Sequence, residues 1–173
     1  RINGDVDNKY YDYYSCVKTE EKAGGISYQK IAGVDCWYEC NFSGNMPELN
    51  FDNPDVKEDM LKVAKYYLDL GVDGFRFDAV KYMYYGNTAK SVDFWKWYME
   101  ELYKIKPDIY CVGECWSGDT EILDYYTAMN CFNFGMSQAE GAVARAVKGS
   151  SISTFTGYVE SLQNSIYSKN SNG

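Results

Sequence analysis

Gly71-Val-Asp-Gly-Phe-Arg-Phe-Asp78 is the stretch of sequence that decides the fold. Gly71 ends a helical pattern, and residues 74–77 then alternate as a short strand does, which places Arg76 and Asp78 on the face opposite the aromatic side chains. Burying an Arg and an Asp costs free energy unless the charges meet each other or a ligand. Because parallel α/β proteins place their chemistry at the C-terminal ends of strands, Asp78 is a candidate functional residue. A structural ion pair is the alternative.

Helical and strand patterns alternate along the chain after residue 52. Asn53 and Pro54 predict a helix start, and Gly71 predicts its end. The expected helices cover residues 53–70, 87 or 91 to 105, 120–128, 138–147 and 154–167, and the expected strands cover residues 74–77, 109–113 and 131–134. This order predicts an α/β fold with parallel strands and covering helices. Three strands do not close a barrel, so we expect a larger sheet.

Residues 1–52 lack sustained periodicity and are rich in Gly, Asn, Asp and Tyr. We interpret them as a loop-rich region with short strands at residues 26–32 and 35–39. The six cysteines do not form the CxxC pairs of a zinc site. A disulfide between Cys36 and either Cys40 or Cys16 stays open.

The composition excludes several classes of function. The net charge of −8 argues against a nucleic-acid or anionic-membrane partner, and no apolar run is long enough to cross a membrane. The absence of His removes Ser-His-Asp and Cys-His catalysis from this stretch. No signal peptide is visible in the given sequence, which begins with Arg1 and not with Met, so its absence says little about the compartment. We nevertheless favour a secreted or cell-surface location over a cytoplasmic one.

Two consecutive predicted strands each end in a carboxylate, Asp78 and Glu114. Neighbouring strands lie about 4.8 Å apart, and retaining glycosidases use two carboxyl groups about 5–5.5 Å apart. Arg76 would keep Asp78 ionised, and the apolar neighbours of Glu114 would keep it protonated, as that chemistry needs. Such carboxylates could also bind a divalent metal, but the next strand offers Asn133 where a third acid would be expected.

Three segments resemble motifs of the α-amylase family of glycoside hydrolases. Residues 74–81 (Gly-Phe-Arg-Phe-Asp-Ala-Val-Lys) resemble its fourth-strand motif, residues 112–116 (Val-Gly-Glu-Cys-Trp) its fifth-strand motif, and residues 46–50 (Met-Pro-Glu-Leu-Asn) the segment that closes its inserted domain. The resemblance implies a partial (β/α)8 TIM barrel comprising strands four to six. Residues 1–52 would then be the C-terminal part of the inserted domain B, and residues 53–173 the central portion of the catalytic barrel.

The resemblance also implies roles for individual residues. Asp78 would be the nucleophile, Glu114 the acid/base, and Arg76 the residue that orients the nucleophile. Lys81 would contact sugar. Tyr82 stands where the family often has His, and we include it as a candidate substrate contact.

Two further residues of these motifs carry expectations. Trp116 could stack on a sugar ring, with packing at the barrel rim as the alternative. Glu48 stands where calcium-dependent members have an Asp ligand, so the resemblance implies calcium there. A salt bridge or a loop anchor is the alternative for Glu48.

The function that we predict is hydrolysis of α-glucans, such as starch or maltooligosaccharides, by a retaining double-displacement mechanism. Action as an α-glucosidase, debranching enzyme or transglycosylase within the same family is an alternative, as is a catalytically silent sugar-binding relative. A metal-dependent barrel enzyme is a third possibility. We expect the isolated 173-residue segment to be inactive.

Overall fold

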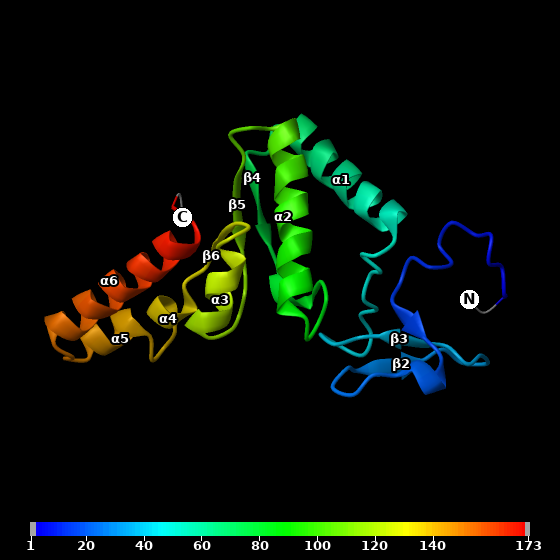
Figure 1. Cartoon of the computed structure of the whole chain (residues 1–173), viewed down its shortest axis with the longest axis horizontal. Coiled ribbons are helices and arrows are strands. Elements are labelled where there is room, and N and C mark those ends of the chain that lie inside the picture. Colours follow the sequence, from blue (N-terminus) through cyan, green and yellow to red (C-terminus); the bar gives the residue numbers. More distant parts are fainter. Residues whose placement is uncertain (1–2, 172–173) are drawn as a thin grey trace. The chain divides into compact units, whose positions relative to one another are not determined.

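The computed structural model describes residues 3–171 (Figure 1). Contacts divide the chain into two compact units. The first contains the described residues up to Gly71 together with Tyr82–Asn87, and the second contains Val72–Lys81 together with the described residues from Thr88 onward.

The first unit contains a small antiparallel sheet with the order β1-β3-β2. Its strands are β1 (Cys16–Val17), β2 (Tyr28–Lys30) and β3 (Trp37–Glu39), and the 3-10 helix η1 (Thr19–Glu21) follows β1. The two strands expected at residues 26–32 and 35–39 are therefore shorter than predicted. Gly33, with a φ of 84°, turns the chain between them. Strand β1 was not predicted, because two residues are too short to show an alternating pattern.

Helix α1 (Pro54–Asp69) completes the regular structure of the first unit. The Asn53 side chain accepts a hydrogen bond from the Asp55 N–H at 2.9 Å, and Pro54 occupies the first helical turn. The helix ends at Leu70, and Gly71 follows in the left-handed region with a φ of 96°. Both predicted ends of this helix are thus confirmed to within one residue.

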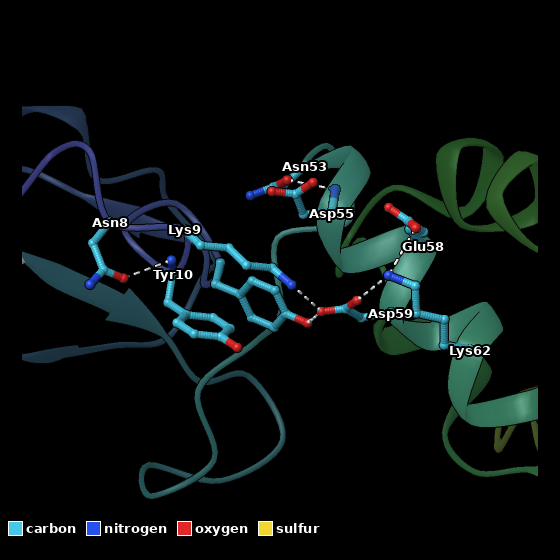
Figure 2. A network of polar contacts seen from close by, with 9 residues as sticks. Asn8, Lys9, Tyr10, Asn53, Asp55, Glu58, Asp59 and Lys62 are labelled. Carbon is cyan, nitrogen blue, oxygen red and sulfur yellow. Dashed lines mark hydrogen bonds and ion pairs between the residues drawn. The ribbon is translucent and has the colours of Figure 1, made fainter. Parts of the chain in front are cut away.

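A polar network joins the N-terminal loop to α1 (Figure 2). Lys9 Nζ lies 3.0 Å from Asp59 Oδ2, and the Tyr13 hydroxyl donates to the same oxygen at 3.0 Å. Lys62 contacts the other oxygen of Asp59 at 3.1 Å and also pairs with Glu58. Hydrogen bonds from Lys9, Lys62 and Tyr13, in that order of effect, lower the pKa of Asp59 to about 2. Asp59 is therefore the centre of this attachment.

The second unit is built on a parallel sheet with the order β4-β5-β6, formed by β4 (Gly74–Phe77), β5 (Tyr110–Gly113) and β6 (Asn130–Cys131). The predicted parallel α/β arrangement is confirmed. Glycine is required at Gly74, because a Cβ there would lie 1.7 Å from the Tyr110 carbonyl oxygen. Gly74 pairs with Tyr110 at this point, where the two strands begin.

Helix α2 (Thr88–Ile105) supplies much of the core of the second unit. The Phe77 ring lies 4.8 Å from that of Trp95 and 5.8 Å from that of Tyr98. The short 3-10 helix η2 (Val80–Tyr82) follows β4, and its Val80 carbonyl accepts from the buried Trp95 indole at 2.8 Å. The buried face predicted for Trp95 is confirmed.

The C-terminal part contains α3 (Asp119–Tyr125), α4 (Phe134–Ser137), α5 (Ala142–Val147) and α6 (Ile152–Lys169). The predicted strand 131–134 ends at Cys131, because Asn133 caps α4 by accepting from the Met136 N–H at 2.9 Å. The helix predicted at residues 138–147 is confirmed only from Ala142 to Val147, where α5 lies. The chain folds back so closely that a Cβ on Gly141 would lie 2.5 Å from the Met136 carbonyl.

Candidate active site

Asp78 and Glu114 follow adjacent parallel strands at the same edge of the sheet. The last paired residues of β4 and β5 are Phe77 and Gly113. The Glu114 N–H continues the ladder by donating to the Phe77 carbonyl at 2.8 Å. The predicted juxtaposition of two strand-end carboxylates is therefore present in the fold.

Arg76 contacts both carboxylates. Its Nη1 lies 2.6 Å from Asp78 Oδ1, and its Nη2 forms an ion pair with Glu114 Oε2. The contact with Asp78 follows the sequence prediction, whereas the contact with Glu114 was not predicted. Desolvation lowers the pKa of Arg76, but the two negative charges outweigh it and leave the pKa above its ordinary value. Arg76 thus stays cationic between the two acids.

The two carboxylates differ in their exposure to solvent. The Asp78 side chain is 65% exposed, and the Glu114 side chain is only 21% exposed. Cys115, the next residue, is fully buried, and this burial raises the pKa of its thiol to about 12. A thiol that stays protonated is a poor nucleophile. The carboxylates are therefore the stronger candidates for chemistry at this edge.

Lys81 and Trp116 also lie together at this edge. Lys81 Nζ donates to the Trp116 carbonyl at 2.7 Å, which ties the segment after β4 to the segment after β5. The Trp116 ring is 63% exposed and stacks on Phe134 with a centroid separation of 5.1 Å. Both rings border a hollow of about 440 Å³, which is also lined by Asp119.

Tyr82 belongs to the first unit, as Glu48 does, whereas the other candidates belong to the second unit. Its ring lies 5.3 Å from Phe42 and stacks on Tyr85 at 5.1 Å. These contacts are aromatic packing within that unit. A sugar-binding role for Tyr82 stays a prediction.

Glu48 lies in the loop that follows β3. Its Oε1 accepts from the Asn41 and Phe42 N–H groups at 2.9 and 3.4 Å. Burial raises the pKa of Glu48, although these two backbone bonds oppose the shift. Within residues 3–171 no group of three or more Cys, Asp or Glu side chains is arranged to hold a metal ion.

The donors around Glu48 fit the loop anchor better than a calcium cage, which takes six to eight oxygen ligands. A calcium ion at Glu48 stays a prediction, and chelation followed by metal analysis of the complete protein would check it.

Ala79 is a feature of the site that sequence reasoning missed. Its φ is 48°, and it is the one non-glycine residue with a positive φ in the described part of the chain. Alanine is not a residue type that signals a turn, so nothing in the sequence pattern marked this conformation. Residues held in this way cluster at functional sites.

A parallel α/β sheet with paired carboxylates at its strand ends is a feature that this chain shares with a family of known proteins. The sequence model of the α-amylase catalytic domain matches residues 3–163. The chain therefore belongs to the α-amylase family, and its three parallel strands with their helices are part of that family's (β/α)8 barrel. No helix within residues 3–171 has the length and hydropathy to span a membrane.

The relatives of this chain are named for different activities. The chain is 42% identical over 130 residues to "Alpha-amylase 3" of Dictyoglomus thermophilum, an alignment that covers 74% of this chain and 25% of that protein. It is 35% identical over 92 residues to "Trehalose synthase" of Pimelobacter, which covers 46% of this chain and 16% of that protein. The solved structure of "Eubacterium rectale Amy13B" superimposes with a TM-score of 0.86 at 32% identity, covering 95% of this chain and 32% of that one. The chain thus spans a quarter to a third of these two amylase-type relatives.

Proposed function

We propose that the protein to which this chain belongs is a retaining glycoside hydrolase that acts on α-glucans by double displacement. The observation that carries the proposal is one guanidinium in contact with two carboxylates at the ends of adjacent parallel strands. One positive charge balances one of the two acids. A pair of carboxyl groups at neighbouring strand ends is the arrangement that this mechanism uses, with one as nucleophile and the other as acid and base.

Asp78 acts as the nucleophile in this proposal. Its carboxylate attacks the anomeric carbon and forms a glycosyl-enzyme, while the less exposed Glu114 gives a proton to the departing glycosidic oxygen. In the second step Glu114 removes a proton from water, which attacks the same carbon and releases Asp78. Arg76 cannot act as the proton donor, because a guanidinium does not lose its proton in a protein. Its role is to hold both acids in place.

The proposed substrate is starch or a maltooligosaccharide. Support comes from the family membership and from the α-amylase and glucan-transfer names of the relatives. The exposed face of Trp116 offers a surface on which a sugar ring could stack. A secreted or cell-surface location for the protein stays a prediction, which fractionation of the producing cells would check.

The roles of the two acids are tested in the complete protein by Asp78→Asn and Glu114→Gln. Each change should lower kcat on maltooligosaccharides by about 100- to 10,000-fold, because a positioned acid or base contributes that much. Glu114→Gln should recover the glycosylation step with a substrate whose leaving group needs no proton, such as a dinitrophenyl glycoside. Asp78→Asn should not recover.

Matched controls are Asp73→Asn, at the other end of β4 with a side chain that is 98% exposed, and Glu100→Gln, on the exposed face of α2. Both should behave as the wild-type protein does. Wild-type turnover by either of the two strand-end variants would remove the assignment of the site.

Transfer to a second sugar is the other candidate outcome. The names "4-alpha-glucanotransferase" and "Trehalose synthase" among the relatives favour it. A glycosyl-enzyme on Asp78 would react with a sugar hydroxyl in place of water. Incubation with maltotriose separates the two outcomes, since hydrolysis yields only shorter products and transfer also yields longer ones.

A further inference from the structure

The ladder between β4 and β5 continues past the end of both strands with one irregularity. Glu114 donates its N–H to the Phe77 carbonyl at 2.8 Å, and its own carbonyl accepts from the Val80 N–H at 3.0 Å. In a regular parallel ladder the second bond would come from the residue two positions after Phe77, which is Ala79. Here it comes from the third. One extra residue therefore lies opposite Glu114, which is the definition of a β-bulge.

The conformation of Ala79 makes this bulge. A left-handed residue shortens the path of the backbone, and the φ of 48° at Ala79 lets the chain pass from Asp78 to Val80 while both bonds to Glu114 are kept. A residue other than Gly, Asn or Asp adopts this region at an energetic cost, because its Cβ crowds the backbone. The cost is tolerated only where the surroundings hold the backbone in place.

The residue after Ala79 supplies that hold. Val80 is fully buried, its N–H bonds to Glu114, and its carbonyl accepts from the Trp95 indole at 2.8 Å. Lys81 then bonds to the Trp116 carbonyl at 2.7 Å. Phe77 and Val80, on either side of Asp78 and Ala79, are thus both hydrogen-bonded to the backbone of Glu114.

We propose that the Asp78–Ala79 bulge sets the position of the nucleophile against the acid/base, and that Ala79 is a positioning residue for the glycosylation step. This inference rests on the proposed function of Asp78 and Glu114. Bulges occur rarely in parallel pairs, are enriched next to active sites and re-aim a side chain there. Without the extra residue, the Val80 bond to Glu114 would be lost, and the backbone would leave Asp78 along another path.

The test compares substitutions at residue 79 that differ in their tolerance of a positive φ, with Asn and Thr as a pair of polar side chains of similar size. Ala79→Asn and Ala79→Gly keep the left-handed conformation accessible, whereas the β-branched variant Ala79→Thr disfavours it strongly. In the complete protein, Ala79→Asn and Ala79→Gly should leave kcat on maltooligosaccharides close to the wild-type value. Ala79→Thr should lower kcat by about 100-fold, the effect of a displacement near 1 Å, with little change in KM.

Controls separate positioning from loss of the fold. Ala89→Thr, on an exposed turn of α2, should leave kcat unchanged, and a thermal melt of each variant reports folding. Equal losses of kcat in Ala79→Asn and Ala79→Thr, or wild-type kcat in Ala79→Thr, would overturn the inference. If Ala79→Thr does not fold, the folded Ala79→Asn and Ala79→Gly proteins decide. A large loss of kcat in them overturns the inference, and wild-type kcat supports it.

The same assays distinguish this inference from the function on which it rests. Asp78→Asn and Glu114→Gln are measured in parallel. Active Asp78→Asn or Glu114→Gln protein would mean that the proposed function fails. Inactive acid variants together with a fully active Ala79→Thr protein would mean that the bulge inference alone fails.

Discussion

The charge at the candidate site is distributed over three side chains. Arg76 reaches both Asp78 and Glu114 because a guanidinium presents several N–H donors in a planar fork. A lysine ammonium carries the same charge on a single nitrogen. The geometry of the donor, in addition to its charge, therefore determines whether both acids can be held.

Arg76→Lys tests this geometry in the complete protein. We expect kcat to fall by roughly 10- to 100-fold, because one ammonium cannot place both carboxylates and small misplacements are costly. Steady-state kinetics on maltooligosaccharides measure this effect. An unchanged kcat would show that only the positive charge matters.

At the scale of single elements, α1 shows how local sequence signals and long-range contacts cooperate. The Asn53 cap and Gly71 define its ends. The N-terminal loop is attached to α1 through Asp59. The Asp59 carboxylate accepts hydrogen bonds from Lys9 and Tyr13, which lie about 50 residues earlier in the chain (Figure 2). The pKa of Asp59, about 2, lies below the ordinary value of 3.8.

This lowered pKa predicts a pH dependence for the attachment. A group whose pKa is depressed on folding contributes stability above its unfolded pKa, and that contribution is lost as the pH falls through the folded value. The loop should therefore be protected at neutral pH and lose protection between pH 3.8 and about 2. Asp59→Asn should expose residues 9–14 to hydrogen exchange already at pH 7.

The control for this prediction is Asp69→Asn, which removes an exposed ion pair with Lys65 at the other end of α1. It should leave exchange in residues 9–14 unchanged. High salt should weaken the protection in the wild-type protein, because the Asp59 pairs are accessible to solvent. Equal protection in Asp59→Asn and wild-type protein would contradict the role given to Asp59.

At the scale of the whole molecule, the described residues leave apolar surface and strand edges open. Strands β4 and β6 each pair on one side within residues 3–171. Tyr66, Leu70, Val147 and Ile152 are between 61% and 82% exposed. Surfaces of this kind favour association when nothing covers them.

The 173-residue segment produced alone should therefore be inactive and should aggregate or melt without cooperativity. Its activity on starch, its sedimentation and a calorimetric scan would measure this. The complete protein, assayed in the same way, is the control. A soluble, cooperatively melting segment would show that the described residues suffice for a stable domain.

The sequence alone was sufficient for features that depend on neighbours in the chain. The ends of α1, strand β4 and the burial of Trp95 follow from caps and periodicity, and the strand-end acids Asp78 and Glu114 follow from the order of elements. The early end of β6 did not, since it depends on Asn133 capping α4, and neither did the late start of α5, which follows the close backbone approach at Gly141.

Only the tertiary structure showed how the site is held together. The contact of Arg76 with Glu114 joins residues 38 positions apart, and the bond of Lys81 to Trp116 joins residues 35 apart. The left-handed Ala79 is imposed by bonds to β5, against the local preference of alanine. Local pattern therefore determined which residues stand at the strand ends, and pairing between distant strands decided how those residues face one another.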